Sequence, residues 1–244
     1  MKKLLTIAVC ASAVAALADT TINLGTVGVT KISSSAKNTI VVTSYTELDG
    51  SSASQMAVSN VIKTANLTAG DKLYVLNAGG TAYEGYTLAY VSGSSGPMYW
   101  NKDLNYSVNA QGIASSGTES TSPAIPSLDV GKGFWLSRAS APSGSFDFYI
   151  YGAPAASSTV TAAAGKTTLV GNPTQTSKAP SITGMAKGDK IMVFEGNNTL
   201  PTVYTSSGSA WRNASTRTEG LPTITAGTGF WYVSKGSSAV SIAW

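Results

Sequence analysis

Residues 131–136 (GKGFWL) and residues 227–232 (GTGFWY) share the pattern Gly-x-Gly-Phe-Trp, and this repetition decides the fold that the sequence predicts. A second motif, Gly-Asp-Lys, lies upstream of each copy, at residues 70–72 and again at residues 188–190. Between the two motifs each copy has a tryptophan followed closely by asparagine, at residues 100–101 and 211–213. Three landmarks that recur in the same order indicate a duplicated module.

The remaining sequence is typical of an all-β chain. Short runs rich in Val, Ile, Thr, Tyr and Phe alternate with clusters of Gly, Ser, Asn, Asp and Pro, and no segment keeps a helical period. We therefore expect two tandem homologous antiparallel modules, each a β-sandwich or barrel-like. The expected boundaries are a signal peptide at 1–18, N-terminal strands joining module 1 at 19–57, module 1 at 58–152, a linker at 153–166 and module 2 at 167–244.

Residues 1–18 have the features of a secretory signal peptide. Lys2 and Lys3 form a positive start, an apolar run covers residues 4–14, and residues 16–18 (ALA) form a small-residue cleavage site. The apolar run is shorter than the ~20 residues of a membrane-spanning helix, and no later stretch approaches that length. We expect an exported protein, in the periplasm, at the cell surface or outside the cell, without a stable transmembrane helix after cleavage.

Composition excludes several classes of chemistry. The single cysteine, Cys10, lies within the signal peptide, and the chain has no histidine. The mature protein therefore lacks disulfides, thiolate or imidazole metal sites and a histidine-based hydrolase triad. We expect no metal and no cofactor. The net charge of +4 includes Lys2 and Lys3, and the other cations are scattered, so we expect no nucleic-acid partner.

The repeated aromatic pairs have two interpretations. Adjacent residues on a strand point to opposite faces, so one aromatic of each pair enters the module core and its neighbour needs a cover. That cover is the other module, a loop or a ligand such as a sugar. Trp100 and Trp211 follow loops rich in Gly and Ser and are either ligand contacts or core residues. The candidate ligand-binding residues are Trp100, Trp135, Trp211 and Trp231; the structural landmarks are Gly70, Asp71, Gly133, Phe134, Gly188, Asp189, Gly229 and Phe230.

Asp71 and Asp189 are the carboxylates that the repeat singles out. Each lies in a turn that enters a strand, where aspartate usually accepts backbone N–H bonds. The alternative is a glycosidase, which needs two carboxylates in one cleft, but repetition places one Asp in each module. We name no catalytic residue and expect no enzyme. Residues 164–168 (AGKTT) match the end of a phosphate-binding loop, but Val160 stands where that motif requires glycine.

The second module also resembles modules of uncharacterised exported bacterial β-repeat proteins. The resemblance rests on residues 169–173 (LVGNP), 188–193 (GDKIMV) and 227–231 (GTGFW). The first module matches at the latter two motifs and has residues 58–61 (VSNV) where the glycine and proline would stand. The resemblance implies a secreted β fold with a surface or extracellular role, and it implies no reaction.

The sequence leaves three functions open. The leading one is a non-catalytic exported β protein that is a structural or adhesive component of the cell surface or envelope. The second is a glycan-binding module that uses exposed tryptophans. The third is an outer-membrane β-barrel, because Val240, Ile242 and Trp244 alternate at the end of the chain, although most strands are shorter than the ~9–11 residues such barrels use. The expected partners are surface polysaccharide or other envelope proteins, with possible self-association through edge strands.

Overall fold

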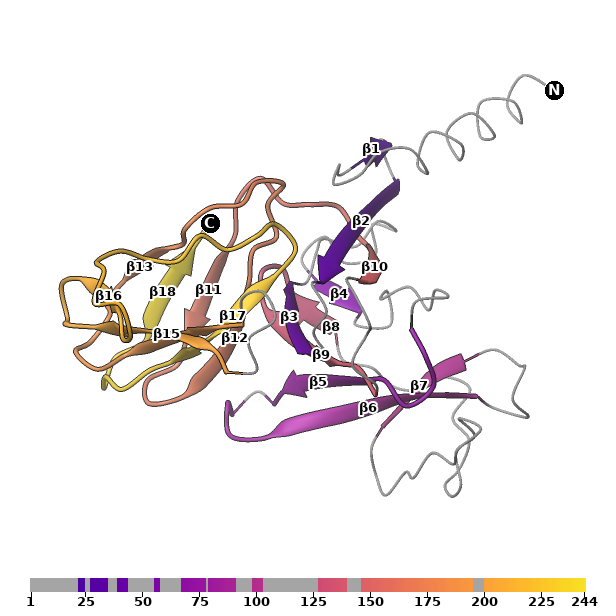
Figure 1. The fold of residues 1–244 in the computed structure, drawn as a ribbon, viewed down its shortest axis with the longest axis horizontal. Coiled ribbons are helices and arrows are strands. Elements are labelled where there is room, and N and C mark those ends of the chain that lie inside the picture. Colours follow the sequence, from indigo (N-terminus) through magenta and orange to yellow (C-terminus); the bar gives the residue numbers. More distant parts are fainter. Residues whose placement is uncertain are drawn as a thin grey trace.

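The structure is all-β, which confirms the expected fold class. The computed structural model describes residues 22–24, 27–34, 39–43, 55–57, 67–77, 79–90, 98–102, 127–139, 146–194 and 200–244. Every regular element within these residues is a strand. The expected signal peptide lies outside the described residues. We call β1–β10 the first half of the molecule and β11–β18 the second half (Figure 1).

The second half contains a five-stranded antiparallel sheet. Its strands, in order across the sheet, are β12 (Thr167–Gly171), β17 (Gly229–Val233), β14 (Lys190–Val193), β15 (Thr202–Ser206) and β16 (Trp211–Asn213). The Gly-x-Gly-Phe-Trp motif leads into the second of these strands, and Gly-Asp-Lys leads into the central one. The two motifs therefore meet on neighbouring strands.

The first half contains a five-stranded sheet with the corresponding order. Its strands are β3 (Thr39–Thr43), β9 (Gly133–Ser137), β5 (Lys72–Leu76), β6 (Tyr83–Tyr90) and β7 (Met98–Lys102). The repeated motifs again lie on the second and central strands. The two sheets thus share their topology.

The two sheets also share their register. Val42 lies opposite Phe134 in the first sheet. Val170 lies opposite Phe230 in the second. The same correspondence holds residue for residue in the other three strand pairs of each sheet. The two five-stranded sheets therefore agree in strand order and in pairing register.

Further strands accompany each five-stranded sheet. In the second half, β11 (Thr159–Ala162), β18 (Val240–Ala243) and β13 (Ser181–Thr183) form a three-stranded sheet with β18 at its centre. In the first half, β1 (Ile22–Leu24), β2 (Val27–Ser34) and β10 (Phe146–Tyr151) form another, and β4 (Gln55–Ala57) pairs with β8 (Ser127–Asp129).

One expected segment, the linker, differs from the structure. The expected linker, residues 153–166, contains β11, because Val160 and Ala162 alternate with exposed residues and pack into the core. The place that β12 takes in the second sheet belongs in the first to β3, which lies upstream of residues 58–61, the expected counterpart of LVGNP. Residues 58–61 lie outside the described residues. The N-terminal strands β2 and β3 pair within the chain, with β10 and β9.

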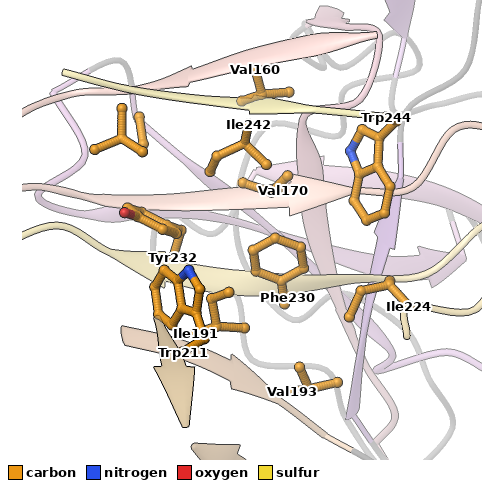
Figure 2. Close-up of a cluster of buried hydrophobic side chains, with 12 residues drawn as sticks. Val160, Val170, Ile191, Val193, Trp211, Ile224, Phe230, Tyr232, Ile242 and Trp244 are labelled. Carbon is orange, nitrogen blue, oxygen red and sulfur yellow. The ribbon is translucent and has the colours of Figure 1, made fainter. Parts of the chain in front are cut away.

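The core of the second half lies between its two sheets (Figure 2). Val160 and Ile242 face inward from the three-stranded sheet, and Phe230 and Tyr232 face them from β17. Residues two apart on a strand share a face, so Trp231 between them points the other way. Burying one side chain of this size contributes about 1.5–3 kcal/mol to stability. Phe230 and Tyr232 therefore both stabilise the packing of β17 on the core. Phe134 is equally buried at the corresponding place in β9.

Candidate functional site

The two halves meet through reciprocal backbone bonds. The N–H of Thr43, at the end of β3, donates to the carbonyl of Gly227 at 3.0 Å. The N–H of Gly171, at the end of β12, donates to the carbonyl of Gly131 at 2.7 Å. Because β3 corresponds to β12, and Gly131 to Gly227, each bond is the counterpart of the other. The junction therefore has local twofold character.

Glycines are required at this junction for two reasons. Gly131 and Gly227, the first residues of the repeated motif, have φ values of 85° and 81°, a region that side chains disfavour. Gly171 lies so close to the partner strand that an added Cβ would come within 2.4 Å of the Cα of Thr43. The halves can approach this closely only because no side chain stands at Gly171.

An aromatic cluster fills the space beside these bonds, and we call it the aromatic seam. It consists of Tyr74, Tyr83 and Trp135 from the first half with Phe194 and Trp231 from the second. The rings of Trp135 and Trp231 meet edge to face at 5.5 Å, a favourable geometry for aromatic pairs. The indole N–H of Trp231 donates to the Tyr83 hydroxyl oxygen at 2.8 Å. Partial burial raises the pKa of Tyr83 above its ordinary value.

The seam places two of the four candidate ligand-binding tryptophans against each other. Trp135 and Trp231 each lie behind a core phenylalanine, as expected for adjacent residues on a strand. The cover that each one needs is the opposite half rather than a ligand. Leu169 and Trp231 are the buried members of a hydrophobic cluster that is smaller than the core of the second half, and Trp135 packs against it.

The other two candidate tryptophans are core residues in this structure. Trp100 is fully buried, and Trp211 is 4% exposed and packs edge to face on Tyr232 at 6.1 Å. Neither ring offers a face on which a sugar could stack. The preceding Gly- and Ser-rich sequence suggested exposure, but β7 and β16 return to the edge of each sheet and turn their tryptophans inward.

Asp71 is buried and held by donors from two parts of the first half. Its Oδ2 accepts the N–H of Thr68 at 2.9 Å, and its Oδ1 accepts the N–H of Ala139 at 2.8 Å. The Arg138 guanidinium forms an ion pair with Oδ2 at 2.8 Å. The expected turn bond is present, but its donor precedes the aspartate by three residues, and the carboxylate also clamps the segment that follows β9.

Asp189 repeats this arrangement in the second half. Oδ2 accepts the N–H of Ala186 at 2.8 Å, and Oδ1 accepts the N–H of Lys235 at 2.6 Å. The hydroxyl of Tyr232 donates to Oδ2 at 2.6 Å. Burial opposes ionisation of Asp189, but these hydrogen bonds outweigh it and hold the pKa of the carboxyl below its usual range. Burial, the hydrogen bond and the Asp189 charge raise the pKa of Tyr232 far above normal.

A cleft of about 320 Å³ opens between the halves, next to the seam. The end of β5, the β5–β6 turn and the start of β9 form one wall, and β11 and β12 form the other. Three charged side chains line it: Glu84 and Lys132 from the first half and Lys166 from the second. Lys132 forms an ion pair with Asp129 at 2.8 Å.

Two of the charged residues that line the cleft have uncharged counterparts in the second half. The register that relates the halves places Thr202 where Glu84 stands and Thr228 where Lys132 stands. The second half thus carries threonines at the places of Glu84 and Lys132. The sequence did not predict this site, because its residues come from distant segments. Only the AGKTT stretch, which contains Lys166, resembles part of a known ligand-binding motif.

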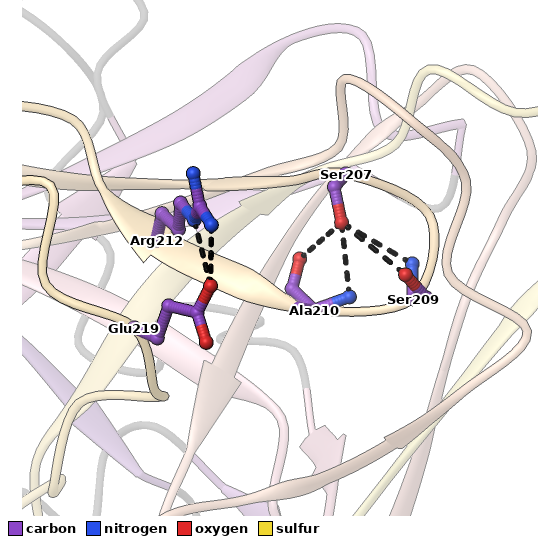
Figure 3. A network of polar contacts seen from close by, with 5 residues as sticks. All are labelled: Ser207, Ser209, Ala210, Arg212 and Glu219. Atoms are coloured by element: carbon purple, nitrogen blue, oxygen red, sulfur yellow. Dashed lines mark hydrogen bonds and ion pairs between the residues drawn. The ribbon is translucent and has the colours of Figure 1, made fainter.

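Other polar groups in the second half belong to surface loops. Arg212 and Glu219 form an ion pair at 2.5 Å across a loop, and Ser207 bonds both backbone groups of Ala210 (Figure 3). Both partners of the ion pair are about 60% exposed, so it contributes at most about 1 kcal/mol. These contacts shape the loops and gather no reactive groups.

Comparison of the chain with protein-family models, curated proteins and solved structures found no match. Within the part of the chain that the structure describes, there is no helix of the length and hydropathy needed to cross a membrane. The resemblance to exported bacterial β-repeat modules stays a prediction from the sequence motifs.

Proposed function

We propose that the protein is a non-catalytic exported β protein that serves as a structural or adhesive component of the cell surface or envelope. One observation carries the proposal: the repeated landmark side chains are engaged in holding the fold together. Asp71 and Asp189 clamp strands, Phe134 and Phe230 fill cores, and the tryptophan beside each phenylalanine packs in the seam.

The engagement of the aspartates bears directly on catalysis. A general acid or base must reach substrate, whereas both carboxylates are fully buried. Each is held by backbone donors and by side chains: Arg138 and the Thr68 hydroxyl contact Asp71, and the Tyr232 hydroxyl contacts Asp189. This favours a structural over a glycosidase role for the two residues that the repeat singles out.

The junction between the halves supports a mechanical role. Backbone hydrogen bonds and packed aromatic rings connect the two halves directly. The halves therefore form one stiff unit rather than two domains joined by a flexible linker. Stiffness of this kind suits a component that spaces, anchors or displays other parts of an envelope.

Export is tested by sequencing the N-terminus of the protein recovered from the cells that make it. We expect cleavage after Ala18 and recovery of the protein outside the cytoplasm. The variant Leu5→Arg, which interrupts the apolar run, should accumulate uncleaved inside the cell. Cytoplasmic wild-type protein with an intact N-terminus would refute the proposed location.

The absence of turnover is tested on the purified mature protein with a broad panel of glycosides, esters and peptides. We expect no reaction above the uncatalysed background. Turnover that Asp71→Asn or Asp189→Asn abolishes, while the variant stays folded, would overturn the non-catalytic assignment.

The glycan-binding alternative loses its original support, because the tryptophans that suggested it are packed in cores and in the seam. The charged cleft offers a different basis for ligand binding.

A further inference from the structure

We propose that the cleft between the halves binds a sugar that carries a single carboxylate, such as a hexuronate. This inference rests on the adhesive form of the proposed function and names the ligand class for it. The cleft volume, about 320 Å³, lies at the lower end of the ~300–1,000 Å³ typical of ligand sites. A site of this size suits one sugar unit.

The walls of the cleft are fixed before any ligand arrives. In the β5–β6 turn, the Asn77 side-chain oxygen accepts the N–H of Thr81 at 3.0 Å, and the Gly80 N–H donates to the Asn77 carbonyl. A Cβ at Gly80 would lie 2.8 Å from the carbonyl oxygen of Thr167, so this turn packs directly on the start of β12. A preformed site loses little entropy on binding.

The lining combines the groups that a pyranose ring needs. Its apolar lining comes from both halves, with Val75, Leu76, Leu128 and Leu169. Its polar groups include three hydroxyls, from Thr161, Thr167 and Thr168. Apolar surface suits the C–H face of a sugar, and hydroxyls exchange hydrogen bonds with sugar hydroxyls.

The charges favour a carboxylate. Lys132 and Lys166 both line the cleft, one from each half, and they are the cationic groups available to an anion there. The ion pair of Lys132 with Asp129 is 43% and 55% exposed, and such pairs contribute at most about 1 kcal/mol, so a ligand carboxylate can compete with Asp129 at small cost.

A multiply charged anion fits less well. Glu84 lies in the same lining, where the Tyr86 hydroxyl donates to it at 3.4 Å. With Asp129 beside Lys132, the acidic and basic groups around the cleft balance. The cleft therefore offers paired cations without the excess positive charge that a phosphate dianion would require.

The difference between the two sides of the junction is independent support. Packing alone requires neither Glu84 nor Lys132, because Thr202 and Thr228 stand at the corresponding places in the second half. The shared fold of the two halves therefore does not require charged residues at the places of Glu84 and Lys132.

Binding of D-glucuronate to the purified mature protein, followed by saturation-transfer NMR and calorimetry, tests the inference. D-glucose is the neutral control, and inorganic phosphate is the control for a general anion site. We expect glucuronate to bind and both controls to bind at least about tenfold more weakly. Equal binding of glucose or phosphate, or no glucuronate binding at about 10 mM, would refute the assignment.

Variants locate the site. Lys132→Gln with Lys166→Gln should weaken glucuronate binding about tenfold or more, and Lys132→Arg with Lys166→Arg should retain it. The charge-matched control, Lys187→Gln with Lys235→Gln, changes two exposed lysines outside the cleft and should bind as the wild type does. Unchanged binding in the first double variant would overturn the inference. Because this assay uses purified protein, its failure is distinct from failure of the export test.

Discussion

Asp71 and Asp189 occupy corresponding places in the two sheets. Backbone N–H groups at corresponding positions donate to each carboxylate, but a different side chain completes each site. In the first half the third partner is the Arg138 guanidinium; in the second it is the Tyr232 hydroxyl. Leu136 occupies the position of Tyr232 in the first sheet. The backbone hydrogen bonds are thus common to both halves, whereas the side chain that contacts the carboxylate comes from a different position in each.

The largest expected effect comes from removing the aspartate of the first half. Asp71→Ala deprives Arg138, whose side chain is 9% exposed, of this carboxylate, and breaking a buried ion pair in this way costs about 3–5 kcal/mol. Asp189→Ala leaves a neutral hydroxyl and backbone donors, so we expect a smaller loss, about 2–3 kcal/mol. Urea unfolding followed by circular dichroism measures both.

Moving the tyrosine of the second half to the corresponding position of the first tests the same comparison. Leu136→Tyr with Arg138→Ser installs the arrangement of the second half in the first, and this double variant should be more stable than Arg138→Ser alone. If the added tyrosine gives no gain, the two sites are not interchangeable.

The seam offers a second comparison, between its two tryptophans. Trp231→Ala removes a ring that is 6% exposed and hydrogen-bonded to Tyr83, so we expect a loss of about 3 kcal/mol. Trp135→Ala should cost less, about 2 kcal/mol, because Trp135 is only partly buried. Thermal unfolding gives the ranking, and Tyr83→Phe isolates the hydrogen bond at about 1 kcal/mol. Equal losses for the two tryptophans would show that the seam is symmetric in energy.

The close approach of the halves is tested at Gly171. Gly171→Ala places a methyl group against Thr43, and we expect a loss of about 1–3 kcal/mol from this overpacking. Adding Thr43→Gly should recover only part of the loss, because the Cα of Thr43 stays 2.4 Å from the new Cβ, and a double-mutant cycle measures the recovery. Gly79→Ala, where the new Cβ finds only an ordinary 3.5 Å contact, is the control. A fully stable Gly171→Ala protein would contradict the packing at the junction.

The smallest expected effects depend on pH. The pKa of Asp189 is lowered in the folded state, so its contribution to stability is present above its ordinary value of 3.8 and declines as the pH falls below it. The pKa of Tyr232 is raised, so its contribution is present below 10.0 and declines as the pH rises. Stability measured from pH 2 to 11 should therefore fall less steeply in acid for Asp189→Asn, and less steeply in alkali for Tyr232→Phe. Unchanged slopes would mean that neither group titrates differently on unfolding.

Much of the fold could be predicted from local patterns. The motifs that contain Phe134 and Phe230 gave the repeated strands, because adjacent aromatics after glycines fit a strand buried on both faces. The strand β11 could not be predicted, because its inward residues, Val160 and Ala162, are small and resemble linker composition. They are buried only because the strand belongs to a second sheet. The counterpart of β12 was misplaced, because Thr43 takes the position of Gly171 and so hides the LVGNP pattern.

The site was less accessible to sequence reasoning. Aromatics that dominate a repeat are equally suited to cores and to ligand platforms, so Trp100 and Trp211 could be assigned only when their burial was known. The cleft depends on which strand ends face each other across the junction. Lys132 and Lys166 are separated along the chain by β9, β10 and β11, and nothing in their spacing indicates that both line one cavity.

The reciprocal bonds at Thr43 and Gly171 have a consequence for how the protein responds to force. The two bonds join the same pair of bodies side by side, so pulling the bodies apart must rupture both in one event, together with the interlocked rings between them. A single-molecule stretching record should then show one high force peak for separation of the halves rather than two successive low ones.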